Sequence, residues 1–191
     1  MARALFIIDV QNDFTEGGAL GVDGGAAVAA GISEYLEANP DRYDLVFASR
    51  DWHDGTNDNG GHFAEGAPDF VDTWPVHCVA GTPGAEYHPA LDTSDVDFHI
   101  QKGQGKPAYS IYEGTTEDGE SVKDLVASHS VDTIDVVGIA TDYCVRASAL
   151  DALADGKRVR VLTDLVAGVA AASSVAALDE LADAGVVVTE S

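Results

Sequence analysis

The chain has 191 residues, 46% of them hydrophobic, and 33 acidic residues against 10 basic ones give it a formal net charge of -23. A chain of this length can form a compact core without disulfides, and no apolar run approaches the ~20 residues that cross a membrane. Such an acidic surface repels phosphate groups, which excludes nucleic acids and anionic membranes as partners. The acidity serves solubility or, as a sharper hypothesis, adaptation to high salt.

Short β-branched runs alternate with helical patterns along the chain, as is typical of an α/β protein. In chain order, we expect a strand at 4–10, a helix at 26–38, strands at 44–49 and 97–101, a helix at 120–128, a strand at 133–139, a helix at 143–154, a strand at 158–163, a helix at 173–184 and a strand at 186–189. Several strands are apolar on successive positions, which indicates that both faces of the sheet are covered. The sequence therefore predicts one domain over residues 1–191, with a doubly wound, six-stranded, mainly parallel sheet and helices on both faces. The irregular stretch at about 50–95 is long enough to suggest a functional loop region.

The first apolar stretch is short and ends at Asp9, which is unlike a signal peptide. Two cysteines, Cys78 and Cys144, are too few for a disulfide framework in a chain of this size. We therefore expect a cytoplasmic protein in a reducing compartment, with one thiol available for chemistry. The sequence allows either a monomer or a homo-oligomer.

Residues with catalytic chemistry stand where four predicted strands end. Asp9 ends the first strand, Asp51 and His53 follow the second, Lys102 ends the third and Cys144 follows the fourth. In open α/β sheets, ligands bind beyond the carboxyl ends of the strands, near the point where the strand order reverses. We expect these side chains to meet at one edge of the sheet.

A cysteine, a lysine and an aspartate can serve as nucleophile, electrostatic partner and base. The amides and dipole at the start of the predicted helix favour the Cys144 thiolate, and a nearby Lys102 ammonium would lower the thiol pKa further. Asp9 can take the thiol proton or pass it to a leaving amine. Taken singly, each residue has a structural alternative: a buried apolar thiol, a solvated strand end and a turn former. Their joint placement favours catalysis.

One carboxylate and three imidazoles gather after the second strand: Asp51, His53, His62 and His77. These ligands suit a single divalent transition metal ion, namely zinc, iron or manganese. Ordinary loop histidines are the alternative. The long stretch rich in Gly, Asn and Asp before His62 leaves Asp54 or Asp58 as substitute ligands. The remaining histidines are interpreted as structural or surface residues: His88, His99 and His129.

Three aromatic residues lie near the candidate catalytic and metal-binding residues in the sequence: Phe14 after Asp9, Trp74 between His62 and His77, and Tyr109 after Lys102. Flat walls of this kind suit a flat heteroaromatic substrate, although core packing explains any single one of them equally well.

Taken in order, the motifs resemble the nicotinamidase/pyrazinamidase branch of the isochorismatase-like cysteine hydrolases, from Arg3 to Glu180. The resemblance is carried by these segments: Asp9-Val10-Gln11-Asn12-Asp13-Phe14, Asp51-Trp52-His53, His62-Phe63, Trp74-Pro75-Val76-His77-Cys78-Val79, Gly81-Thr82-Pro83-Gly84, Lys102-Gly103, Ala108-Tyr109-Ser110 and Val137-Gly138-Ile139-Ala140-Thr141-Asp142-Tyr143-Cys144-Val145.

The resemblance implies an isochorismatase-like hydrolase fold and the hydrolysis of nicotinamide, and of pyrazinamide, through a thioester on Cys144. It implies a catalytic triad of Asp9, Lys102 and Cys144. It implies metal ligation by Asp51, His53, His62 and His77. It implies an oxyanion hole at the amides of Ala140 and Cys144, next to a cis peptide between Ile139 and Ala140. The substrate would then contact Phe14, Trp74, Tyr109, Ile139 and Ala140.

Other functions share this set of residues. A related cysteine hydrolase would act on another small amide, such as an N-carbamoyl compound, but that chemistry needs no metal to anchor a ring. A vinyl-ether hydrolase of the same superfamily needs no nucleophilic thiol, so the presence of Cys144 argues against that function. An idle metal-binding protein on the same fold would lack activity altogether, and the intact triad argues against it.

Overall fold

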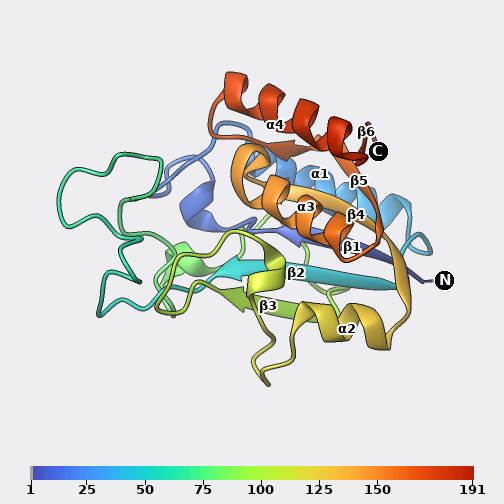
Figure 1. Cartoon of the computed structure of the whole chain (residues 1–191), viewed down its shortest axis with the longest axis horizontal. Helices are drawn as coiled ribbons and strands as arrows, with labels where there is room; N and C mark the ends of the chain where they lie inside the picture. The colour runs from blue at the N-terminus through green and yellow to red at the C-terminus, as the bar shows by residue number, and fades with distance from the viewer. Residues whose placement is uncertain (1) are drawn as a thin grey trace.

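A computed structural model describes residues 2–191 (Figure 1). Over these residues, six strands form one sheet in the order β3-β2-β1-β4-β5-β6. Their bounds are β1 (Ala2–Ile8), β2 (Leu45–Asp51), β3 (Phe98–Lys102), β4 (Val131–Ile139), β5 (Arg158–Ala167) and β6 (Val187–Thr189). Every neighbouring pair is parallel. The strand order reverses between β1 and β4, which is where a ligand is expected in a doubly wound sheet.

Helices cover both faces of the sheet, because side chains alternate between the faces along each strand. Figure 1 shows α1 (Gly25–Ala38) behind the sheet and α2 (Val122–Ser128) and α3 (Arg146–Ala154) in front of it. The last helix, α4 (Ala171–Ala184), also belongs to the front layer, because its Leu181 lies in the same hydrophobic cluster as residues of α2 and α3. On one face, Leu5 and Ile7 pack with Ile32 of α1. On the other face, Phe6 packs with residues of α2, α3 and α4. Full burial of each such side chain contributes about 1.5–3 kcal/mol to stability. The parallel sheet with helices on both faces confirms the prediction of a doubly wound α/β fold.

Glycine brings the two central strands close together where they end. A Cβ atom on Gly138 of β4 would lie 2.2 Å from the carbonyl oxygen of Ile8 in β1, and Gly138 has a φ of 113°. Only glycine adopts this conformation freely and leaves room for the neighbouring backbone. The segments that follow β1 and β4 therefore start side by side.

Two predicted elements differ from the structure, apart from shifts of a few residues at other boundaries. The first strand was expected to reach residue 10, but it ends at Ile8 because Asp9 has a φ of 48°, in the left-handed region. The helix expected at 143–154 is an α-helix only from Arg146. A π-helical turn, Thr141–Val145, precedes it, and such turns are frequent at functional sites.

The segment between β2 and β3 contains only one short 3-10 turn, Pro83–Ala85. This segment and the 3-10 turn Asn12–Phe14 lie beyond the carboxyl ends of the strands, at the left of Figure 1. A third 3-10 turn, Ile111–Glu113, packs on the front face of the sheet with α2 and α3. Among residues 2–191, no helix is both long enough and apolar enough to span a bilayer.

Candidate active site

Asp9 lies directly after β1 and its side chain is completely buried. Ser49 Oγ donates a hydrogen bond of 2.7 Å to Asp9 Oδ1. Asp9 Oδ2 lies 2.9 Å from the ammonium of Lys102 and accepts no hydrogen bond within the described chain. Burial raises the pKa of Asp9, and the attraction of Lys102 offsets only part of this rise. Asp9 thus pairs one oxygen with Ser49 and the other with Lys102, and its raised pKa suits a group that accepts a proton.

Lys102, the last residue of β3, is completely buried and links several groups of opposite charge. Its Nζ forms ion pairs with Asp9 and Asp51 and lies 3.7 Å from the sulfur of Cys144. Burial alone would lower the pKa of Lys102, but the two carboxylates outweigh it and raise the pKa well above the ordinary value. The ammonium therefore stays charged and holds two carboxylates and a sulfur around one point.

Cys144 lies in the π-helical turn after β4, is 7% exposed and lines a cavity. Burial raises the pKa of its thiol well above the ordinary value, and Lys102 lowers it only in part. The expected lowering of the thiol pKa is thus wrong for the resting protein, because removal of water outweighs the nearby positive charge. At this raised pKa the sulfur keeps its proton, and the Asp9 carboxyl group next to it is placed to accept that proton.

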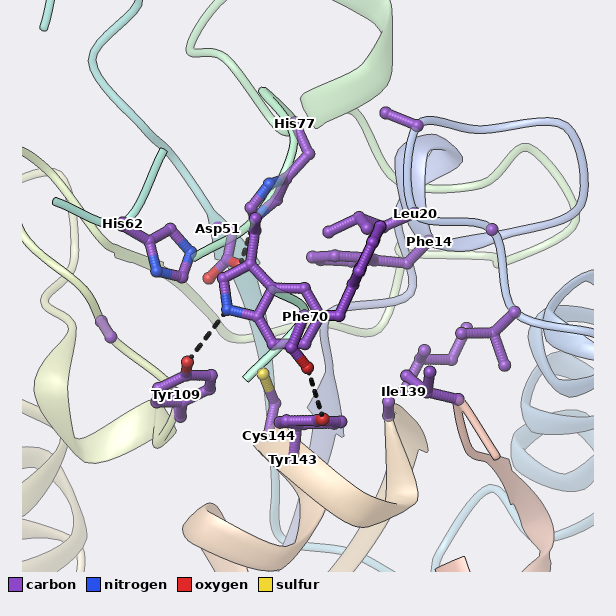
Figure 2. A pocket seen from close by; sticks show the side chains of 17 residues that line it. Phe14, Leu20, Asp51, His62, Phe70, His77, Tyr109, Ile139, Tyr143 and Cys144 are labelled. Atoms are coloured by element: carbon purple, nitrogen blue, oxygen red, sulfur yellow. Dashed lines mark hydrogen bonds and ion pairs between the residues drawn. The ribbon is translucent and has the colours of Figure 1, made fainter. Parts of the chain in front are cut away.

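The three histidines of the candidate metal site come together. Ligand nitrogens of His53, His62 and His77 lie within 4.8 Å of one another, and all three side chains are buried. Asp51 Oδ2 lies 3.6 Å from His53 Nε2 and 3.8 Å from His77 Nε2. Figure 2 shows Asp51, His62 and His77 on the same side of the cavity, above the sulfur of Cys144.

Backbone carbonyls orient two of these rings. His53 Nδ1 lies 2.8 Å from the Gly103 carbonyl oxygen, and His77 Nδ1 lies 2.7 Å from that of Pro75. A proton on each Nδ1 leaves Nε2 with a lone pair for a metal. His53 Nε2 is buried and has no hydrogen-bond partner in residues 2–191. Such an orphaned acceptor inside a ring of imidazoles fits a metal ion.

Charge at the cluster also fits a cation. Burial first, and then the neighbouring imidazoles, lower the pKa of His62 to about 4, so its ring is neutral near pH 7 and can act as a ligand. Asp54 and Asp58, the substitute ligands, stay outside the cluster. Asp54 accepts hydrogen bonds from Thr56 and Asn57, and Asp58 accepts one from Gly60.

The cavity between the triad and the histidines has a volume of about 310 Å³. Aromatic side chains form much of its wall: Phe14, Phe70, Trp74, Tyr109 and Tyr143. Trp74 Nε1 donates to the hydroxyl of Tyr109 at 3.2 Å, and the indole meets the ring of Tyr143 edge-on at 5.1 Å between centroids. Ile139 and Ala140 complete the lining, and the peptide bond between them is cis, as expected. The space suits a flat ring whose reactive atom faces Cys144.

The family model for the isochorismatase domain matches residues 3–191. The chain belongs to the isochorismatase domain family. It is 52% identical over 184 residues to a nicotinamidase/pyrazinamidase of Mycobacterium tuberculosis, covering 96% of each chain. A solved pyrazinamidase of Pyrococcus horikoshii in complex with zinc is 35% identical with a TM-score of 0.85, and each chain is covered over 100% of its length. PnC1 from L. infantum, solved in complex with nicotinate, is 34% identical with a TM-score of 0.84, over 99% of this chain and 92% of that one.

Some residues of this isochorismatase domain were not predicted as part of the site. Phe70, at a φ of 58°, lines the mouth of the cavity and accepts a hydrogen bond of 3.4 Å from the hydroxyl of Tyr143. Leu20 and Val169 also line the cavity from distant segments. Gln11 holds the backbone of Asp51 by accepting from its N–H and donating to its carbonyl oxygen. Gln11 belongs to the Asp9–Phe14 motif, but Asp51 lies 40 residues away in the sequence, so residue spacing does not reveal the contact.

Proposed function

We propose that the protein is a nicotinamidase that hydrolyses nicotinamide to nicotinate and ammonia, and pyrazinamide in the same way. The observation that carries this proposal is one aromatic cavity with Cys144 on one side and a histidine cluster on the other. The nicotinamidase/pyrazinamidase that is 52% identical supports the substrate class. A flat pyridine ring matches the aromatic wall, and its carboxamide would reach the sulfur.

Four side chains are proposed to hold one divalent transition metal ion: Asp51, His53, His62 and His77. Zinc, iron and manganese all accept such ligands, and the zinc in the P. horikoshii structure supports zinc. When bound, the ion supplies a Lewis acid that anchors the ring nitrogen of the substrate, directly or through water. Phe14 and Trp74 would flank the ring and fix the position of the amide carbon.

The chemistry begins with transfer of the Cys144 proton to Asp9 while the sulfur attacks the amide carbon. The charge that develops on the amide oxygen meets the backbone N–H groups of Ala140 and Cys144. Asp9 then passes the proton to the amide nitrogen, the C–N bond breaks, and ammonia leaves a thioester behind. Lys102 stays positive throughout and compensates the charge that alternates between Asp9 and the sulfur.

Hydrolysis of the thioester reuses the same base. Water gives a proton to Asp9 as its oxygen attacks the thioester carbon, and the C–S bond breaks. Asp9 returns the proton to the sulfur, and nicotinic acid leaves and releases its remaining carboxyl proton to solvent as nicotinate. The cycle restores both the thiol and the carboxylate.

Replacement of Cys144 by alanine tests the proposal. We expect ammonia release from nicotinamide to fall below detection while the metal content stays equal to that of the unmodified protein. Substantial activity in Cys144→Ala would contradict the mechanism. A panel of small amides assayed with the unmodified enzyme decides the substrate class, since preference for a non-aromatic amide would favour a related cysteine hydrolase.

A further inference from the structure

The loop between His53 and His62 is held together by one buried amide. Asn59 is completely buried although the residues around it, from Gly55 to Gly61, are exposed. Its φ of 50° is in the left-handed region, which asparagine tolerates better than most residues. A buried amide in an otherwise exposed, polar loop requires partners for all its polar atoms.

Asn59 uses its whole hydrogen-bonding capacity. Its Oδ1 accepts from the backbone N–H of Asp54 at 2.9 Å and from that of Gly105 at 3.0 Å. Its Nδ2 donates to the carbonyl oxygens of Asp54 at 2.8 Å and Asn57 at 3.3 Å. Two acceptor and two donor positions are therefore filled, the maximum for this side chain.

These partners connect the metal-site residues on both sides of the loop. Asp54 directly follows His53, and the His62 N–H donates to the Asn59 carbonyl oxygen at 3.4 Å. Gly105 lies in the segment after Lys102, where the Gly103 carbonyl faces His53 Nδ1 at 2.8 Å. The Asn59 side-chain amide thus ties the start of the loop to the segment that orients the His53 ring, and the backbone of the same residue holds the end of the loop at His62.

The space around this segment leaves little freedom. A Cβ atom on Gly103 would lie 2.5 Å from the ring of His53, so the segment packs directly on the imidazole. A Cβ on Gly60 would lie 3.4 Å from Pro107, so the loop also packs on the same segment. Displacement of the loop would therefore move His62 relative to His53.

We propose that Asn59 is a positioning residue of the metal site, whose buried amide fixes the 54–61 loop so that His53 and His62 face the same point. The inference rests on the proposed metal site. Without the amide, the loop must be ordered when the metal binds, and metal affinity falls. Loss of a partner that orients metal ligands typically costs about 10–100-fold in affinity.

The Asn59→Gly variant tests this role, because glycine keeps the left-handed backbone and deletes only the amide. The dissociation constant for Zn²⁺ is measured by competition with a chromophoric chelator, beside nicotinamide turnover at limiting and saturating zinc. We expect a dissociation constant about 10–100-fold higher, and turnover that recovers at saturating zinc. Asn39→Gly is the matched control, because Asn39 also donates to a backbone carbonyl, that of Tyr35 at 2.8 Å, but at the end of α1.

Zinc affinity in Asn59→Gly equal to that of the unmodified protein would overturn the proposal, and so would an equal loss in Asn39→Gly. If Asn59→Gly does not fold, Asn59→Asp carries the test. It keeps oxygen acceptors for Asp54 and Gly105 but loses both donors, and unchanged zinc affinity there would equally refute the role. Failure of the proposed function looks different: the unmodified protein would bind zinc, and Asn59→Gly would weaken that binding, without any release of ammonia from nicotinamide.

Discussion

Replacement of Lys102 by methionine would remove the ammonium at the centre of the site while keeping a side chain of similar length. Lys102 and Asp9 are completely buried, and Asp51 is 3% exposed. A divalent ion at the proposed metal site would still compensate Asp51, so the variant leaves Asp9 with the Ser49 hydrogen bond but without a positively charged partner. Breaking a buried ion pair from one side costs about 3–5 kcal/mol.

Protonation of Asp9 in the folded variant would cost a free energy of the same magnitude. In the variant, Asp9 can avoid a buried charge by taking up a proton. At pH 7 this protonation takes place about three pH units above the ordinary pKa of an aspartate, and each unit costs about 1.4 kcal/mol. The cost is therefore about 4 kcal/mol. Burial already raises the pKa of Asp9 in the folded protein, and loss of the ammonium raises it further. A raised folded pKa means that the stability loss is largest at neutral pH and shrinks as the pH falls towards 4.

Urea unfolding of the unmodified protein and of Lys102→Met between pH 4 and pH 8 measures this loss. The double variant Asp9→Asn/Lys102→Met removes both charges, and we expect it to recover most of the lost free energy of unfolding while releasing no ammonia. A Lys102→Met protein as stable as the unmodified one at pH 7 would refute the reasoning. A double variant no more stable than the single one would do the same.

Further predictions concern the cavity mouth, the core and the surface. Asp69 Oδ1 accepts hydrogen bonds from the N–H groups of Val71, Asp72 and Thr73 and so holds the turn that carries Phe70. Because Phe70 lines the cavity, Asp69→Ala should raise the KM for nicotinamide severalfold with little change in kcat. Steady-state kinetics measure this effect, and Asp69→Asn, which keeps the acceptor oxygen, should show no such rise. Burial raises the pKa of Tyr43 far above 10, and its hydroxyl donates to Asp135 at 2.7 Å. The contribution of Tyr43 to stability is therefore complete below about pH 10 and is lost progressively as the pH rises further. Tyr43→Phe should lower the free energy of unfolding by about 1.5–3 kcal/mol at pH 7. Above about pH 10, the free energy of unfolding of this variant should decline less steeply than that of the unmodified protein. The net charge of -23 predicts that the melting temperature rises between dilute buffer and molar salt, and a flat response would leave solubility as its explanation.

The fold was predictable because its signals are local. Runs such as residues 5–8 are short, rich in Leu, Phe and Ile, and apolar on successive positions, which is typical of strands in a sheet covered on both faces. The stop of the last helix at Gly185, in a left-handed conformation with a φ of 105°, also follows from residue type. Because parallel strands end at one edge, the meeting of Asp9, Lys102 and Cys144 followed from their positions at strand ends.

What could not be predicted depends on contacts between distant segments. The left-handed turn at Asp9 and the π-helical turn before α3 have no signal in residue spacing. The raised pKa of the Cys144 thiol depends on how completely the assembled site excludes water, whereas the sequence shows only the nearby charges. The contacts of Gln11 and Asn59 join segments about 40 residues apart. The roles of such residues can be recognised only when the backbone around the proposed metal site is known.

Mass spectrometry of the enzyme, acid-quenched during turnover of nicotinamide, tests the central claim most directly. A covalent Cys144 intermediate predicts a fraction of the protein heavier by one nicotinoyl group, located by peptide mapping on the peptide that contains Cys144 and absent from Cys144→Ala. A nicotinoyl group found on another residue, or ammonia release by Cys144→Ala at the rate of the unmodified enzyme, would contradict it.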